Sequence, residues 1–340
     1  MDKRIKWVDY AKAISIIFVV LLHAGIPDPG KGLVRVFLIP LFFFLSGIFT
    51  NPHKYPSYIT FIKQKGIRIL IPYFFFNFIT YLFWLLIGRH YGLDSEFKDN
   101  PVEPIFGILY STSTWMKHYV PLWFLACLFM VESIYYFAFR KIKRLNVKLV
   151  FLFLFGVLGY LNYIYNPYPL PWSIDIALPM IVFYGVGSLL KNPLLKMDKN
   201  VFRYLLLSIL SFAVVFLLYE VNAEVKVFIN VYGNYVYFFI GAFAGILFSV
   251  SMLKMLDIYL KPVRFLQFIG ENTLIILALH LIAGSVVKAV SFYILDLPMS
   301  IYEITWVKIV YGLFSIIILI PVMLFFNRFL PSLIGKSKAA

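Results

Sequence analysis

The fold of this chain is decided by residues 7–25, which read WVDYAKAISIIFVVLLHAG. The segment is long enough to cross a bilayer as a helix, which takes about 20 mainly apolar residues. It nevertheless contains Asp9, Lys12 and His23. An ionisable side chain at membrane depth costs at least about 2.5 kcal/mol and by default marks a functional site. We therefore expect a membrane-spanning helix that carries part of a site.

Helical geometry relates the charged residues of this segment to one another. Lys12 and His23 are eleven residues apart, which returns an α-helix to within about 20° of the same face and spans about 16 Å. Asp9 and Lys12 can pair, because residues i and i+3 adjoin. His23 lies about 22 Å into a hydrocarbon core about 30 Å thick. Simpler interpretations stay open: Asp9 and Lys12 as interfacial residues, and His23 as a packing histidine.

The composition extends this interpretation to the whole chain. Hydrophobic residues make up 62% of the 340 residues and charged residues 14%, whereas soluble domains are about half apolar and a quarter charged. We therefore predict an all-α polytopic membrane protein, with one transmembrane domain over residues 1–340 and no appended soluble domain. The first span lacks a small-residue cleavage site, so we expect no cleavable signal peptide. About ten transmembrane helices are expected, near residues 8–25, 33–50, 67–88, 119–139, 147–165, 174–190, 203–220, 233–253, 266–288 and 306–329.

The net charge of +15 reflects topology. When the N-terminus is placed inside, 22 of the 31 Lys and Arg residues lie in cytoplasmic segments. The positive-inside rule then predicts both termini in the cytoplasm. The basic excess indicates attraction to anionic membrane lipids, and we expect no nucleic-acid partner.

Three further segments matter because of a resemblance. Asp9-Tyr10-Ala11-Lys12, followed by an apolar run and His23, resembles the start of the bacterial acyltransferase 3 family of integral-membrane O-acyltransferases. Members of this family typically show Arg or Lys, ten residues and then His. The resemblance reaches to about residue 285, through PLFFFLSGIF (40–49), WFL (123–125) and GENTLIILALHLI (270–282). It implies transfer of an acyl group, expected to be acetyl, from acyl-CoA to a cell-surface or lipid-linked glycan in the bacterial cytoplasmic (inner) membrane.

Candidate donor-binding residues lie in and after the second span. The resemblance associates an Arg-x-x-Arg with coenzyme A, and Lys65 and Arg68 stand at those positions. A cation pair suits phosphates, since Lys acts as a point charge and Arg as a fork. Both residues are alternatively explained as cytoplasmic membrane anchors. Ser46 belongs to a Ser-Gly pair that either admits a ligand or forms a packing notch between helices.

Trp123, His118 and His280 are weaker candidates for contact with the acceptor substrate. Trp123 belongs to the family's Trp-Phe-Leu segment, and His118 lies at the outer rim of its span. His280 lies deep in the ninth span, where a structural histidine bonded to a neighbour is the favoured alternative.

The chemistry follows from what the chain carries and what it lacks. With five His, one Cys and neither HExxH nor CxxC, no metal site is expected. Acyl transfer from a thioester needs a base for the attacking hydroxyl, and imidazole has a suitable pKa. We therefore predict His23 as general base, assisted by Lys12 and Asp9. Two alternatives remain: a transporter or flippase for glycan precursors, and a lipid-linked glycosyltransferase that would use Asp28.

Overall fold

The computed structural model describes residues 5–91, 100–196, 200–259 and 263–336. The chain divides into two compact units. The first comprises Met1–Asn51, Lys143–Tyr163 and Leu178–Thr273, and the second Pro52–Ile142, Ile164–Ala177 and Leu274–Ala340. Each unit is therefore built from segments distant in sequence. No strand forms in the described ranges, where Lys226 and Val231 make an isolated bridge.

The predicted number of spans is confirmed. Ten helical segments of the described chain are long and apolar enough to cross a membrane: Lys6–Ala24, Gly30–Ile48, Tyr58–Gly88, Val120–Phe139, Leu145–Tyr165, Pro171–Leu189, Val201–Val221, Tyr235–Tyr259, Thr273–Ile294 and Thr305–Phe329.

Three spans differ from the predicted ranges by six residues or more, and the eighth span extends to Tyr259, beyond the predicted end at residue 253. The third begins at Tyr58, so Lys65 and Arg68 lie inside a continuous helix. The ninth begins at Thr273, because a separate helix, α11 (Arg264–Glu271), ends at Asn272. The side-chain amide of Asn272 donates to the carbonyl of Phe268 at 2.8 Å, which satisfies a backbone group at this helix end.

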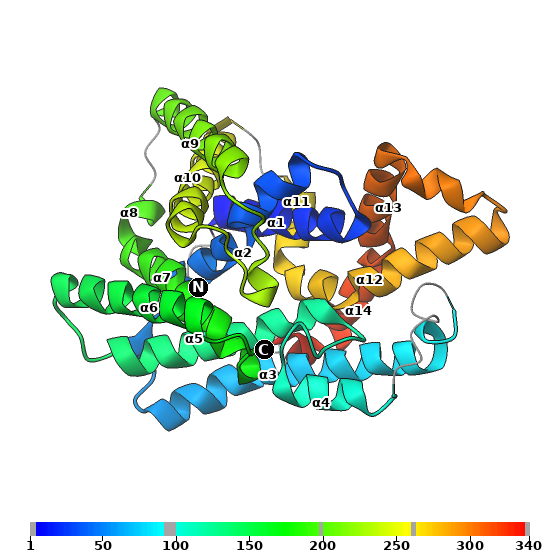
Figure 1. The fold of residues 1–340 in the computed structure, drawn as a ribbon, viewed down its shortest axis with the longest axis horizontal. Helices are drawn as coiled ribbons and strands as arrows, with labels where there is room; N and C mark the ends of the chain where they lie inside the picture. Colours follow the sequence, from blue (N-terminus) through cyan, green and yellow to red (C-terminus); the bar gives the residue numbers. More distant parts are fainter. Residues whose placement is uncertain (1–4, 92–99, 197–199, 260–262, 337–340) are drawn as a thin grey trace. The chain divides into compact units, whose positions relative to one another are not determined.

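In the first unit, α1 (Lys6–Ala24) packs against α11, and α10 (Tyr235–Tyr259) packs against both α2 (Gly30–Ile48) and α9 (Val201–Val221). Figure 1 shows α9 and α10 side by side. Glycines permit these close approaches. A Cβ at Gly270 would meet the carbonyl of Asp9, and a Cβ at Gly245 would meet the ring of Phe37. The first unit also contains α8 (Lys191–Leu195) and most of α6 (Leu145–Tyr165) and α7 (Ile174–Leu189).

Helices α2 and α7 touch through their backbones. A Cβ at Gly47 would overlap the carbonyl of Tyr184, and a Cβ at Gly187 would overlap that of Phe44. Small residues at a helix crossing allow backbones to approach in this way, which favours van der Waals packing in a membrane. Gly47 therefore acts as the packing notch that the Ser-Gly pair suggests.

In the second unit, α3 (Tyr58–Phe83) continues into a π-helical turn, Trp84–Gly88, and packs against α5 (Trp123–Phe139). Helix α4 (Glu103–Tyr110) lies in the loop predicted between the third and fourth spans, of which residues 92–99 fall outside the described ranges. The Tyr73 hydroxyl of α3 donates to the Ile108 carbonyl of α4 at 2.5 Å. Helices α12 (Thr273–Ala289), α13 (Thr305–Ile318) and α14 (Ile320–Phe329) follow.

A short C-terminal turn completes the second unit. The 3-10 helix Pro331–Ile334 packs against α3, and Gly335 follows it in the left-handed conformation at φ 70°. A Cβ at Gly335 would lie 2.5 Å from the backbone oxygen of Arg68. Glycine is therefore required at Gly335 both for its conformation and for its closeness to α3.

Candidate functional site

Helix α1 holds the predicted pair Lys12 and His23 on one continuous helix. It ends at Gly25, whose left-handed conformation (φ 85°) lets its N–H bond the carbonyl of Leu22 at 3.2 Å. Glycine is suited to this cap because it has no Cβ penalty at positive φ. His23 consequently lies in the last turn of α1, at the opposite end of the helix from Lys6.

His23 is an exposed residue, and its ring has a defined orientation. Its Nδ1 atom lies 2.9 Å from the carbonyl oxygen of Val19. A carbonyl only accepts, so Nδ1 carries the hydrogen, and the lone pair of the neutral ring is on Nε2. The local structure thus fixes the tautomer in which Nε2 is the basic atom.

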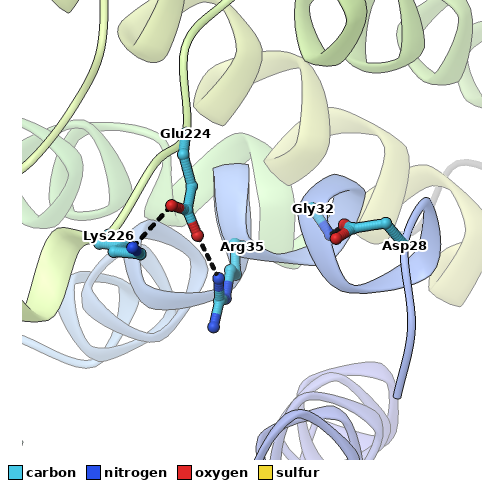
Figure 2. A network of polar contacts seen from close by, with 5 residues as sticks. All are labelled: Asp28, Gly32, Arg35, Glu224 and Lys226. Atoms are coloured by element: carbon cyan, nitrogen blue, oxygen red, sulfur yellow. Dashed lines mark hydrogen bonds and ion pairs between the residues drawn. The ribbon is translucent and has the colours of Figure 1, made fainter. Parts of the chain in front are cut away.

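Helix α2 and the segment after α9 carry a charged network, shown in Figure 2. One Glu224 oxygen accepts from Arg35 at 2.8 Å, and the other lies 2.6 Å from Nζ of Lys226. The bond from Lys226 holds the pKa of Glu224 below its ordinary value, so Glu224 is ionised at neutral pH. Arg35 and Lys226 therefore share one ionised carboxylate, which joins α2 to the segment after α9.

Asp28 has a structural role in the loop between α1 and α2. Its Oδ1 atom accepts from the backbone N–H of Gly32 at 2.9 Å, which satisfies a donor of the first turn of α2 (Figure 2). This is the carboxylate that a glycosyltransferase mechanism would have to use, and here it stabilises a helix end.

In the N-terminal half of α1, Lys12 contacts Phe49, which follows the Ser-Gly pair. Its Nζ is 5.0 Å from the ring centroid of Phe49, a cation–π contact. Ser46, three residues earlier, donates its hydroxyl to the carbonyl of Phe42 at 2.9 Å. The structure therefore brings together Lys12 and the segment around Ser46, two regions that the sequence suggested separately.

In the second unit, the two cations of the Lys-x-x-Arg pair have different environments. Nζ of Lys65 lies 2.7 Å from Oε2 of Glu132, whose side chain is only 7% exposed. Arg68 is exposed, and its side chain has no hydrogen bond or ion pair with another described residue. Of the two, Arg68 is the cation that remains available to an anionic ligand.

The three acceptor candidates lie in the second unit and are buried. Trp123 begins α5 and is 4% exposed. His118 is 8% exposed, its ring makes an edge contact with Tyr81, and neither ring nitrogen has a hydrogen-bond partner among the described residues. Burial lowers the pKa of His118 to about 4, so the ring is neutral at physiological pH.

His280 has the environment of a structural histidine. It is 2% exposed, and its Nδ1 lies 2.9 Å from the carbonyl of Ile276, four residues earlier. The hydroxyl of Tyr119 lies 3.4 Å from the same nitrogen and donates to the carbonyl of Leu277. These contacts support the structural interpretation over contact with substrate.

The comparison with known families decides the class of protein. The model of the acyltransferase 3 family, described as an acyltransferase domain, matches residues 5–328. The chain belongs to the acyltransferase 3 family. No curated protein and no solved structure matches it. Family membership identifies the chain as a membrane acyltransferase and does not favour the transporter or flippase alternative.

The structure adds residues of this acyltransferase that sequence reasoning missed. Glu132 lies in an apolar span, where a carboxylate by itself indicates a buried partner or a functional site. The contact between Arg35 and Glu224 joins residues 189 positions apart. The available sequence signal was that Arg35 is one of the few basic residues in the predicted outer segments. Within the described ranges, no group of three or more His, Cys, Asp or Glu side chains could hold a metal ion.

Proposed function

We propose that this acyltransferase transfers acetyl from acetyl-CoA to a hydroxyl of a cell-surface or lipid-linked glycan, in the bacterial cytoplasmic membrane. The observation that carries the proposal is the orientation of His23. Its Nδ1 is occupied by the Val19 carbonyl, which makes Nε2 the basic atom of the ring, and the residue lies exposed in the last turn of α1. This is the chemical requirement for a general base.

The proposed reaction needs no covalent enzyme intermediate, because the thioester is already activated. Nε2 of His23 takes the proton of the acceptor hydroxyl while its oxygen attacks the thioester carbonyl. The tetrahedral intermediate then collapses, the carbon–sulfur bond breaks, and the departing thiolate receives the proton from the imidazolium. The products are the O-acetyl ester and free coenzyme A.

Arg68 is proposed to bind the phosphates of the donor. Arg68 is exposed, and the planar fork of its guanidinium suits phosphate oxygens. Lys65 contributes less to donor binding in this proposal, because Glu132 already neutralises it. Ser46 is proposed to lie along the donor route.

Lys12 and Asp9 are proposed to line the path towards His23. Lys12 lies on the same helical face as His23, about 16 Å away along the axis. With both termini in the cytoplasm, as the positive-inside rule predicts, the donor enters from the cytoplasmic side and the acceptor from the outer side.

The proposal is tested by mass spectrometry of surface and lipid-linked glycans from cells that express the wild-type protein, the His23→Gln variant or no protein. Wild-type cells should gain the mass of one acetyl group on a saccharide, and the other two should not. Equal acetylation by His23→Gln at matched membrane levels would remove His23 as the base. Absence of any acylated glycan in wild-type cells would overturn the substrate class.

A further inference from the structure

Two lysines of the second unit share one aromatic ring. Nζ of Lys288, in the last turn of α12, lies 4.0 Å from the ring centroid of Tyr302. Nζ of Lys308, in the first turns of α13, lies 5.9 Å from the same centroid. Tyr302 belongs to the 3-10 helix Met299–Glu303 that connects the two spans. Two cations therefore converge where two membrane-spanning segments end.

The protein supplies little negative charge to this cluster. Lys288 forms no ion pair with another described residue. Lys308 lies 3.9 Å from Oε2 of Glu303, whose side chain is 84% exposed, so water screens this contact. Burial raises the pKa of Tyr302, so its hydroxyl stays neutral at physiological pH and cannot act as the counter-charge.

The two ammonium groups are also partly withdrawn from water. The side chain of Lys308 is 21% exposed and Lys288 is half-buried. A cation–π contact attracts each lysine to the ring, but like charges brought together repel, and more strongly where water is partly excluded. An anion between or beside the two lysines would relieve this repulsion.

The surroundings point to the anionic group of a lipid. Ile294, Leu295, Ile304 and Trp306, which flank the cluster in the chain, are between 43% and 74% exposed. Such residues at the ends of spans lie beside acyl chains, with Trp preferred at the level of the headgroups. Basic pockets between transmembrane helices bind lipid headgroups on the cytoplasmic side, and the same pairing of cation and phosphate is available to two lysines on the predicted outer side.

We propose that Lys288, Lys308 and Tyr302 form a binding site for the phosphate of a membrane lipid. The phosphate belongs either to a phospholipid or to a polyprenyl carrier of a saccharide. The two lysines donate to its oxygens, and the flanking apolar residues contact its hydrocarbon chain. This site does not depend on the proposed acyl transfer, and it can be tested without measuring that reaction.

The test is lipid retention by the full-length, detergent-purified protein, measured by native mass spectrometry. Phosphatidylglycerol, a polyprenyl monophosphate and diacylglycerol, which lacks phosphate, are added separately. The amount of phosphate lipid that stays bound to the Lys288→Gln/Lys308→Gln variant should be lower than for the wild type by a factor of about ten or more. Lys288→Arg/Lys308→Arg should retain it, which excludes misfolding as the cause. Lys117→Gln, which removes an exposed lysine paired with Glu103, should behave as the wild type.

The results separate the two lipid sources. Retention of both phosphate lipids identifies a general headgroup site, whereas retention of the polyprenyl phosphate alone identifies a carrier site. Equal retention of phosphatidylglycerol and polyprenyl phosphate by the wild type and the Gln double variant would overturn the proposal. Equal retention of diacylglycerol and the phosphate lipids by the wild type would overturn it as well.

Discussion

Lys65 of α3 and Glu132 of α5 neutralise each other, with Nζ and Oε2 2.7 Å apart. The contact is an ion pair without hydrogen-bond geometry at that oxygen. It lies within two apolar spans of the second unit. Both charges are largely removed from water, so each depends on the other.

The ion pair gives the first prediction. Glu132→Gln leaves the buried Lys65 cation without its counter-charge, which should cost roughly 3–5 kcal/mol and lower the thermal unfolding midpoint in detergent. Lys65→Met should also lower the unfolding midpoint, because it leaves the buried Glu132 carboxylate unpaired. The double variant Lys65→Met/Glu132→Leu should recover most of the loss, because a buried pair can be replaced by apolar groups. Single variants as stable as the wild type would show that the pair contributes nothing to stability.

Arg68 gives the second prediction, which concerns the donor. Loss of a charge-assisted hydrogen bond costs about 1.5–3 kcal/mol, so Arg68→Ala should raise the KM for acyl-CoA roughly 10- to 100-fold. Arg68→Lys should recover only part of this, because the fork is lost. Lys63→Ala, at an exposed position of the same helix, is the matched control and should leave KM unchanged. An unaltered KM in folded Arg68→Ala would leave Arg68 as a membrane anchor only.

The third prediction compares two histidines with different surroundings. His23→Gln should reduce turnover by about 10²- to 10⁴-fold, the usual contribution of positioned proton transfer, while membrane insertion and acyl-CoA binding stay near wild type. His280→Gln should chiefly lower the unfolding midpoint, because His280 is buried against helix carbonyls. The catalytic assignment fails when the two variants show the opposite pattern.

His118 gives a prediction on pH. The unfolded chain binds a proton at this residue below about 6.5, whereas the folded chain does so only below about 4. Stability should therefore be unaffected above pH 6.5 and fall as pH decreases from 6.5 towards 4, by on the order of 3 kcal/mol. His118→Gln should flatten this part of the curve of unfolding midpoint against pH. His90→Gln, at an exposed histidine, should reproduce the wild-type curve.

Two glycines test the packing. Gly47→Ala should destabilise the protein by about 1–3 kcal/mol, since its new Cβ overlaps the Tyr184 carbonyl and a backbone must move. A Cβ at Gly284, in α12, would have no atom within 4 Å. Gly284→Ala should therefore stabilise its helix by about 0.5–1 kcal/mol. Thermal unfolding of the two variants in the same detergent should show a lower midpoint for Gly47→Ala and a higher one for Gly284→Ala than for the wild type.

The sequence could predict what depends on local pattern. Hydrophobic length predicted ten spans, and helical periodicity predicted one helix bearing both Lys12 and His23, which the structure confirms. At the helix end before Thr273, the side chain of Asn272 bonds back to the carbonyl of Phe268. Hydropathy averaged over a span does not register such a detail, so the predicted range 266–288 merges two helices.

Contacts between distant segments lie outside the reach of such patterns. Lys65 is neutralised by a residue of another span, and nothing adjacent to Lys65 in sequence indicates this partner. Arg35 is likewise bound by Glu224 from beyond α9. Sequence reasoning could therefore identify the charged residues but could not tell which of them remain available to a ligand.

The crossing of α2 and α7 changes how the Ser-Gly signature should be interpreted. At Gly47 and Gly187, the space that a side chain would occupy is filled by the backbone of the opposite helix. A short motif used to recognise relatives is commonly assumed to mark reactive groups. Here the glycine of that motif is needed because no side chain fits between the two helices. Its recurrence among relatives would therefore indicate a common helix packing, even among enzymes that modify different molecules.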